Sequence, residues 1–379
     1  MKNKFAGAIL LIGTADTCPN LWYATGFKAV DPVVFLHTAG GQYLLVPQFE
    51  QERARRESRH KEGITILTPE SMKMRKSARK RLAGWALELL RKEGIKKVTV
   101  PVTFPFGIGT ILMKHEIRVY AAKKDLFPER AQKTAQEIQM IRESQHAAVI
   151  AMRAAMAMIQ RSQIDKSNTL KYMGKRLTAE MVKTVIARML LDHNCIAKDT
   201  IVACGQQATD PHETGYGPLK AYEAIVVDIF PQHAAHGYWG DISRTFVRGK
   251  APTQLQQMYR AVRTAQKAAL NRVRAGTFCS TVHNAAARTM EQHGFKTGIV
   301  NGRPVGFIHS TGHGVGLAIH ENPSISRAQK MRLQINNTIT IEPGLYYPDI
   351  GGIRIEDTIV VTKDGWRYLA PCEKVFELL

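Results

Sequence analysis

The sequence predicts an α/β (α+β) protein with a smaller N-terminal domain over residues 1–130 and a larger one over residues 131–379. Three observations lead there. At 379 residues the chain is long for one small domain. Strand-like and helix-like segments alternate through its first third. A charged segment with a proline, Asp125–Lys133, then interrupts this pattern before a long helical run. The composition, 44% hydrophobic and 22% charged, is ordinary for a globular protein with a core.

The first domain is expected to hold one mixed sheet with helices. The expected strands are Ala8–Ile12, Val33–His37, Tyr43–Pro47, Thr65–Leu67, Lys97–Val102 and Glu116–Tyr120. The expected helices are Phe49–His60 and a long basic one, Met72–Lys92. Gly40 and Gly41 separate two of the strands and predict a hairpin.

The second domain is expected to consist of two similar halves, each with helices followed by strands that carry two carboxylates. Its helices are predicted at Thr134–Arg161, Leu170–His193, Thr253–Arg274 and Ser280–His293. Asp228 and Asp241 belong to the first half, and Glu342 and Glu356 to the second. This arrangement favours a site between the two halves.

The formal net charge of +21 is high. It is compatible with affinity for nucleic acid, anionic membrane surfaces or acidic substrates, or with a solvated basic surface. The segment Lys73–Arg81 contains six basic residues. It offers an alternative function, a nucleic-acid or ribosome-associated binding protein. Because the segment lacks interleaved aromatic residues, a solvated helix face is the preferred interpretation.

The five cysteines form no CxxC pair, which fits reduced thiols in a cytoplasmic protein. The N-terminus superficially resembles a signal peptide, but no small-residue cleavage site follows it. No apolar run approaches the roughly 18 residues needed to span a bilayer, so no membrane partner is expected.

Five residues form an ordered series of acids around one imidazole. They are Asp228, Asp241, His313, Glu342 and Glu356. The carboxylates interrupt apolar strand-like sequence, where an ionised acid is costly unless it is paired. One arginine or lysine could neutralise any single acid. Four acids and a histidine together more naturally surround metal ions, which indicates an enzyme.

Strand alternation predicts which side chains share a face with these acids. Three groups result: Thr338, Thr340 and Glu342; Arg354, Glu356 and Thr358; Asp241, Ser243 and Thr245. Such faces could form the wall of a polar site. A solvent-exposed outer face would show the same alternation.

Several segments resemble metallopeptidases of the prolidase and aminopeptidase P type. They are DIFPQHAAHGYWGDISRTF, HSTGHGVGLAIHE, TIEPGLYYP and RIEDTIVVT. The N-terminal segment LWYATGFKAVDPVVFLHTAGGQYLLVPQFEQERA is similar to the smaller domain of the same group. The resemblance therefore implies a creatinase-like N-terminal domain and a C-terminal pita-bread catalytic domain, a fold shared with methionine aminopeptidase and creatinase.

The resemblance also implies a role for each member of the series. Asp228 would hold one metal ion, Asp241 and Glu356 would bridge two, and His313 and Glu342 would complete the second ion's ligands. The carboxylate-rich set favours Mn²⁺, with Co²⁺, Zn²⁺ and Fe²⁺ as alternatives. A hydroxide bridging the ions would attack the scissile carbonyl, with Glu342 as general base.

Further residues match positions that bind substrate and assist proton movement in that group. These are His212, His309 and His320. Arg354 would orient Glu356. The alternative for each histidine is a structural or surface position, which is the interpretation preferred for His233, His236 and His283.

The expected substrate is a peptide with proline at its second position, cut by an Xaa-Pro dipeptidase or aminopeptidase. A homodimer is implied by the resemblance alone. Asp228 and Asp241 are 13 positions apart, somewhat more than is usual for the group. The loop HAAHGYWG is expected to absorb the extra residues without moving either strand.

Overall fold

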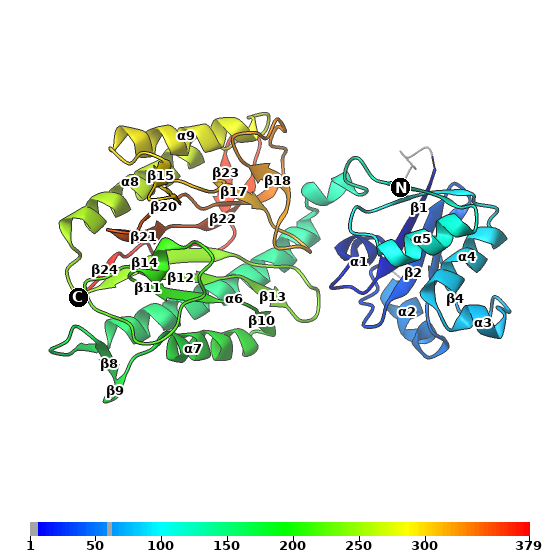
Figure 1. Cartoon of the computed structure of the whole chain (residues 1–379), viewed down its shortest axis with the longest axis horizontal. Helices are drawn as coiled ribbons and strands as arrows, with labels where there is room; N and C mark the ends of the chain where they lie inside the picture. Colours follow the sequence, from blue (N-terminus) through cyan, green and yellow to red (C-terminus); the bar gives the residue numbers. More distant parts are fainter. Residues whose placement is uncertain (1–6, 59–62) are drawn as a thin grey trace. The chain divides into compact units, whose positions relative to one another are not determined.

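The computed structural model describes residues 7–58 and 63–379, and the chain divides into two compact units, residues 1–128 and 129–379. Both units combine helices with strands, as the α/β (α+β) prediction requires (Figure 1). None of the helices in the described ranges is both long enough and apolar enough to cross a membrane.

The first unit is built on one six-stranded sheet in the order β4-β3-β2-β1-β5-β6. Its strands are β1 (Ala8–Gly13), β2 (Val33–Thr38), β3 (Gly41–Leu45), β4 (Ile64–Leu67), β5 (Lys97–Val100) and β6 (Arg118–Ala121). Its helices are α1 (Pro19–Thr25), η1 (Gln48–Glu50), α2 (Gln51–Ser58), α3 (Lys76–Arg79), α4 (Leu82–Lys92) and α5 (Phe106–Lys114). The predicted hairpin is confirmed, because β2 and β3 pair antiparallel with Thr38 opposite Gly41. The predicted end of the α2 helix, His60, lies outside the described residues.

The prediction of one helix over Met72–Lys92 was wrong, because the chain forms α3 and then folds back into α4. Gly84 packs so closely on the backbone of Ala78 that a Cβ at position 84 would collide with it. The indole nitrogen of Trp85 donates to the carbonyl of Arg79 at 2.9 Å and holds the turn. The six basic side chains here are exposed: Lys73, Arg75, Lys76, Arg79, Lys80 and Arg81. Their exposure fits the preferred interpretation of this segment as a solvated helix face.

The first half of the second unit packs two helices on a four-stranded sheet. The helices are α6 (Ala135–Gln160) and α7 (Ala179–Leu191). The sheet has the order β11-β12-β14-β24, with β11 (Ile201–Cys204), β12 (Ile225–Ile229), β14 (Ile242–Arg248) and β24 (Glu377–Leu378). Their apolar faces share one core cluster.

The second half repeats this plan with α8 (Thr253–Leu270) and α9 (Cys279–Gln292). Its five-stranded sheet has the order β18-β17-β19-β22-β23. The bounds are β17 (Gly312–Gly314), β18 (Glu321–Ile325), β19 (Thr338–Ile341), β22 (Asp357–Val361) and β23 (Trp366–Tyr368). Figure 1 shows α8 and α9 on one side of the strands and α6 and α7 on the other.

Shorter elements connect these layers. They are η2 (Pro128–Ala131), β7 (Gln163–Ile164), β8 (Leu170–Tyr172), β9 (Lys175–Arg176), β10 (Cys195–Ala197), η3 (Gln207–Thr209), β13 (Pro231–His233), β15 (Gly298–Val300), β16 (Arg303–Val305), β20 (Gly344–Tyr347) and β21 (Gly351–Arg354). The predicted helix Leu170–His193 was wrong in its first part, which forms the hairpin β8–β9. Met173 and Gly174 turn there with positive φ, which stops a right-handed helix.

Helix α6 begins at a capping box. The Thr134 hydroxyl accepts from the backbone N–H of Glu137 at 3.2 Å, and the Glu137 carboxylate accepts from the N–H of Thr134 at 2.8 Å. Two N–H groups that the helix itself leaves unpaired are thereby satisfied.

Thr134→Ala is expected to lower the free energy of unfolding by about 1 kcal/mol, because one of these caps is lost. Urea denaturation followed by circular dichroism measures the change. Thr264→Ala is the control, because that exposed hydroxyl bonds only to a carbonyl within α8. Equal effects of the two substitutions would contradict the capping role.

Candidate metal centre

The first two acids reach the site from paired strands. Asp228 lies in β12 opposite Ser243 of β14, and Asp241 directly precedes β14. The long interval between them does not disturb this pairing. The intervening residues form β13, which pairs with β10, and a loop beyond it. The loop therefore takes up the extra length, as expected.

Glu342 and Glu356 reach the site from the second half. Glu342 follows β19, and Glu356 lies between β21 and β22. The expectation that Arg354, Glu356 and Thr358 share one face is confirmed, because Arg354 and Glu356 both contact Ser243 Oγ and Thr358 Oγ1 donates to the Asp241 carbonyl. The strand itself is divided, since β21 pairs with β20 whereas β22 pairs with β19. At the break, the backbone N–H of Glu356 donates to the carbonyl of Ser243 at 3.0 Å. This bond brings Glu356 next to the first pair of acids.

His313 belongs to β17, and its ring is oriented as a ligand. Its Nδ1 lies 3.2 Å from the carbonyl oxygen of Gly314, so in the neutral ring, the form that binds a metal ion, the proton belongs on Nδ1 and the lone pair on Nε2. Nε2 lies 3.5 Å from Asp241 Oδ2 and 3.3 Å from Glu342 Oε1. Gly312 is required beside it, because a Cβ there would collide with the backbone of Thr340.

These polar faces are not solvent-exposed. Asp241 is 5% exposed and Glu356 is 2% exposed. Thr338, Thr340 and Thr358 are buried as well. Behind them, Ile339 and Ile341 belong to the apolar core shared with α8 and α9. The alternative of a solvated outer face is therefore wrong, and the site is a buried polar pocket.

Arg354 contacts Asp228 directly and reaches Glu356, the partner expected from the sequence, through a hydroxyl. Its Nη2 lies 2.7 Å from Asp228 Oδ2, and its Nε donates to Ser243 Oγ at 3.0 Å. Ser243 Oγ donates in turn to Glu356 Oε2 at 3.0 Å. The sequence prediction put Ser243 on the face of Asp241 but did not count it as a site residue.

The electrostatics of the pocket show a deficit of positive charge. Burial and then the neighbouring Asp228 raise the pKa of Asp241, and burial and then Asp241 raise the pKa of Glu356. Burial would lower the pKa of His313, but Glu342 and Asp241 outweigh it and raise that pKa to about 9. One arginine cannot balance four carboxylates, whereas two divalent cations match their formal charge.

The donor set fits such ions. One ligand atom from each of Asp241, His313 and Glu356 lies within 4.8 Å of the other two. Asp228 Oδ1 and Glu356 Oε1 are buried without a hydrogen-bond partner among the described residues. A buried carboxylate oxygen with no donor is costly unless a cation occupies the space beside it. The carboxylates and the imidazole could therefore hold a pair of divalent metal ions.

The three other predicted histidines border this pocket. His309 Nδ1 lies 2.7 Å from the Ser310 carbonyl oxygen, and its Nε2 lies 3.0 Å from the Tyr346 hydroxyl. His320 stands edge-on to His313 at 4.3 Å between ring centroids. His212 is exposed. Burial lowers the pKa of both His309 and His320, and the charge of His212 contributes to both shifts.

Glu143, His233 and His236 form another compact group of possible ligands. The two imidazole rings stack at 3.9 Å. The Nδ1 atoms of His233 and His236 accept the backbone N–H groups of Ala235 and Tyr238, both at 3.2 Å. Each neutral ring therefore carries its proton on Nε2, the reverse of His313. In this tautomer the Nε2 atoms offer no lone pair, so we assign the group a structural role.

Glu356→Gln is expected to stabilise the metal-free protein by about 1–2 kcal/mol, because it removes one like charge and supplies a donor to the pocket. The same variant should lose the stabilisation that added Mn²⁺ gives the wild type. Thermal unfolding with EDTA and with Mn²⁺ measures both effects. The exposed Glu291→Gln serves as control, and destabilisation of the metal-free Glu356→Gln protein would contradict the charge deficit.

Comparison with family models gives two matches. Residues 139–363 match metallopeptidase family M24, and residues 1–114 match the creatinase/prolidase N-terminal domain. The first match covers more than half of the chain. The two matches agree with the predicted order of a creatinase-like domain followed by a pita-bread domain.

Individual proteins are similar over nearly the whole chain. A Xaa-Pro dipeptidase of Pyrococcus horikoshii is 30% identical over 361 residues, which cover 94% of this chain and 91% of that protein. The crystal structure of the prolidase from Pyrococcus horikoshii superposes with a TM-score of 0.80 at 26% identity, covering 97% of this chain and 94% of that one. The Xaa-Pro dipeptidase from Bacillus anthracis gives a TM-score of 0.81 at 22% identity over the same shares, a likeness of fold.

Proposed function

The chain belongs to metallopeptidase family M24, and we propose that it is a dinuclear-metal exopeptidase that hydrolyses the Xaa-Pro bond of peptides. The observation that carries the proposal is the convergence of buried carboxylates on His313 in a pocket short of positive charge. The similarity to a Xaa-Pro dipeptidase over 94% of the chain supports the substrate class.

In this proposal Asp228 binds one ion, Asp241 and Glu356 bind both, and His313 and Glu342 complete the second ion's ligands. Mn²⁺ is the proposed metal, because hard divalent ions prefer carboxylate-rich sites. When bound, such ions lower the pKa of water and polarise a carbonyl group. The catalytic role falls to residues 131–379, and residues 1–130 form the accessory domain.

Glu342 is the proposed general base. The Thr340 hydroxyl donates to its Oε1 at 3.4 Å, and the His313 imidazole lies on the same oxygen. These contacts hold the carboxylate in one orientation. Burial would raise the pKa of Glu342, but His313 and the nearby cationic groups lower it to about 2. The carboxylate is therefore ionised, and its assignment as the base rests on its position beside the proposed ions.

The three histidines that border the pocket are proposed to interact with the substrate. Arg354 Nη1 donates to the Tyr346 hydroxyl at 2.9 Å, and this hydroxyl contacts His309 Nε2. The chain of donors keeps His309 neutral and oriented. His320 and His212 are assigned to binding the peptide and steadying the tetrahedral intermediate. Arg354 holds the Asp228 carboxylate in place through a direct ion pair.

A bond before proline suits a dedicated enzyme, because its tertiary amide lacks the N–H that general peptidases use. Xaa-Pro dipeptides are the first choice of substrate, and longer Xaa-Pro peptides are the second. We further propose a cytoplasmic location, which fits five cysteines that form no disulfide, and a homodimer, which rests on the resemblance to the group alone. The alternative of a nucleic-acid-binding protein gains no support from the similar proteins.

The substrate class is tested with metal-stripped protein that has been reloaded with Mn²⁺. Xaa-Pro dipeptides and longer Xaa-Pro peptides are compared with Met-Ala peptides by amino-acid release. We expect turnover of Xaa-Pro substrates that disappears with EDTA and returns with metal. Preference for Met-Ala, or retention of nucleic acid that resists a salt series, would overturn the proposal.

Glu342→Gln is expected to reduce kcat for an Xaa-Pro dipeptide by about 10²–10⁴-fold, because the proton acceptor is lost while the shape is kept. Circular dichroism should show an unchanged fold. Steady-state kinetics at saturating Mn²⁺ separate this effect from weaker metal binding. Turnover equal to that of the Glu291→Gln control would remove Glu342 as the base.

A further inference from the structure

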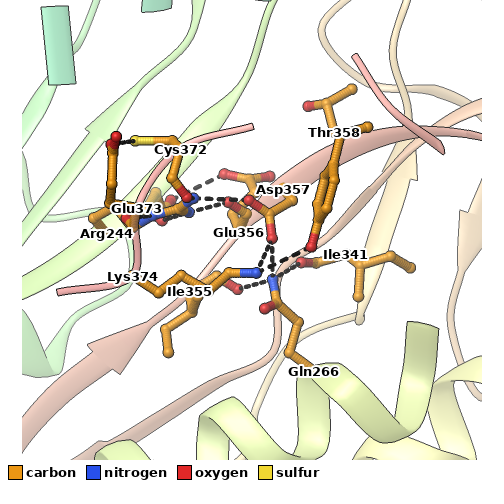
Figure 2. A network of polar contacts seen from close by, with 12 residues as sticks. Arg244, Gln266, Ile341, Ile355, Glu356, Asp357, Thr358, Cys372, Glu373 and Lys374 are labelled. Atoms are coloured by element: carbon orange, nitrogen blue, oxygen red, sulfur yellow. Dashed lines mark hydrogen bonds and ion pairs between the residues drawn. The ribbon is translucent and has the colours of Figure 1, made fainter. Parts of the chain in front are cut away.

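A single buried amide lies directly behind both glutamates of the site. Gln266 on α8 is 1% exposed. Its Nε2 donates to the carbonyl of Ile341 at 3.0 Å and to the carbonyl of Ile355 at 3.1 Å. These two residues immediately precede Glu342 and Glu356. Figure 2 shows the amide between the two carbonyl groups.

We propose that Gln266 is a positioning residue that fixes the distance between the carboxylates of Glu342 and Glu356, and through it the affinity of the site for divalent metal ions. The inference rests on the proposed metal pair. Gln266 itself contacts backbone atoms and Asp357, and its effect on the ions is transmitted through the two carbonyl groups.

The backbone next to Glu342 and Glu356 needs a further contact to hold it in place. Glu356 lies at the break between β21 and β22, and Glu342 follows the last residue of β19. The β19–β22 ladder joins Ile341 to Asp357 and does not include Glu342 or Glu356. Beyond the end of this ladder, the amide of Gln266 links the two chain segments by bonding to the carbonyls of both Ile341 and Ile355.

The orientation of the amide is set by the network behind it. Asp357 Oδ2 accepts from Gln266 Nε2 at 3.1 Å, and the same carboxylate contacts Arg244 Nη2 at 2.8 Å and Lys374 Nζ at 2.6 Å. All three partners of Nε2 are oxygen atoms, so the nitrogen rather than the oxygen of the amide must face them. An apolar side chain of similar size would fill the space but leave buried carbonyl groups without this donor.

The network also reaches Glu356 from its other side. Arg244, 1% exposed, donates through Nη1 to the carbonyl of Ser243 at 2.9 Å and to the carbonyl of Glu356. Glu356 is therefore held on both sides of its α-carbon, by Gln266 through Ile355 and by Arg244 through its own carbonyl (Figure 2). Glu342 has the same support from Gln266 through Ile341.

The test is a Mn²⁺ titration of EDTA-stripped full-length protein by isothermal calorimetry, for wild type, Gln266→Leu and Gln266→Asn. Gln256→Leu is the matched control. Gln256 lies on the same helix, and its Nε2 donates to the Ala251 carbonyl and the Glu377 carboxylate, at 2.9 and 3.0 Å, away from the glutamates. We expect Gln266→Leu to weaken Mn²⁺ binding by about tenfold or more, Gln266→Asn to weaken it less, and Gln256→Leu to leave it unchanged.

A second readout is the activity at rising Mn²⁺ concentration. Because the ligands are intact, kcat of the Gln266 variants should return toward the wild-type value at saturating metal. The inference would be overturned if Gln266→Leu bound Mn²⁺ as tightly as the wild type and lost only as much thermal stability as Gln256→Leu. That result would show a merely structural role for Gln266. If Gln266→Leu does not fold, the affinity of Gln266→Asn decides between the same two outcomes. A wild-type protein that binds fewer than two ions would instead refute the proposed metal pair.

Discussion

The concentration of four carboxylates in one buried pocket is the constraint on which the rest of the second unit depends. Ionised acids that lose water must gain cations or donors, or else take up protons. The raised pKa values of Asp241 and Glu356 and the raised pKa of His313 have this single cause. The unpaired oxygens of Asp228 and Glu356 mark where positive charge is missing. A divalent pair would remove the conflict, and its binding would then stabilise the folded site.

The scaffold contributes cations of its own only at the margin of the pocket. Arg354 neutralises Asp228 from one side. Arg244 and Lys374 instead form ion pairs with Asp357, a buried acid that faces away from the pocket. Breaking such a buried pair by removing one partner leaves an unpaired charge and is costly. Asp357 is thus balanced by its own cations, whereas the neighbouring pocket of four acids is short of positive charge.

Orientation of the imidazole rings separates His313, the proposed ligand, from His233 and His236. His313 directs its ring proton to a backbone carbonyl and presents Nε2 to the acids, whereas His233 and His236 accept backbone N–H groups at Nδ1. Residue type, burial and the presence of a nearby acid cannot separate them, because all three are partly buried histidines near an acid. The hydrogen bond made by the other ring nitrogen decides the chemistry.

Much of the site was determined by the sequence itself. Polar residues at fixed spacing within apolar strands identify the five members of the acid–histidine series, because burying them without partners would be unfavourable. Local patterns failed where the chain turns inside a predicted helix, at the β8–β9 hairpin and between α3 and α4. They gave no sign of Gln266, one of four glutamines in α8. Its partners lie 75 and 89 positions away, so only the packing of α8 against two strands selects it. Such contacts depend on tertiary distances, which periodicity does not encode.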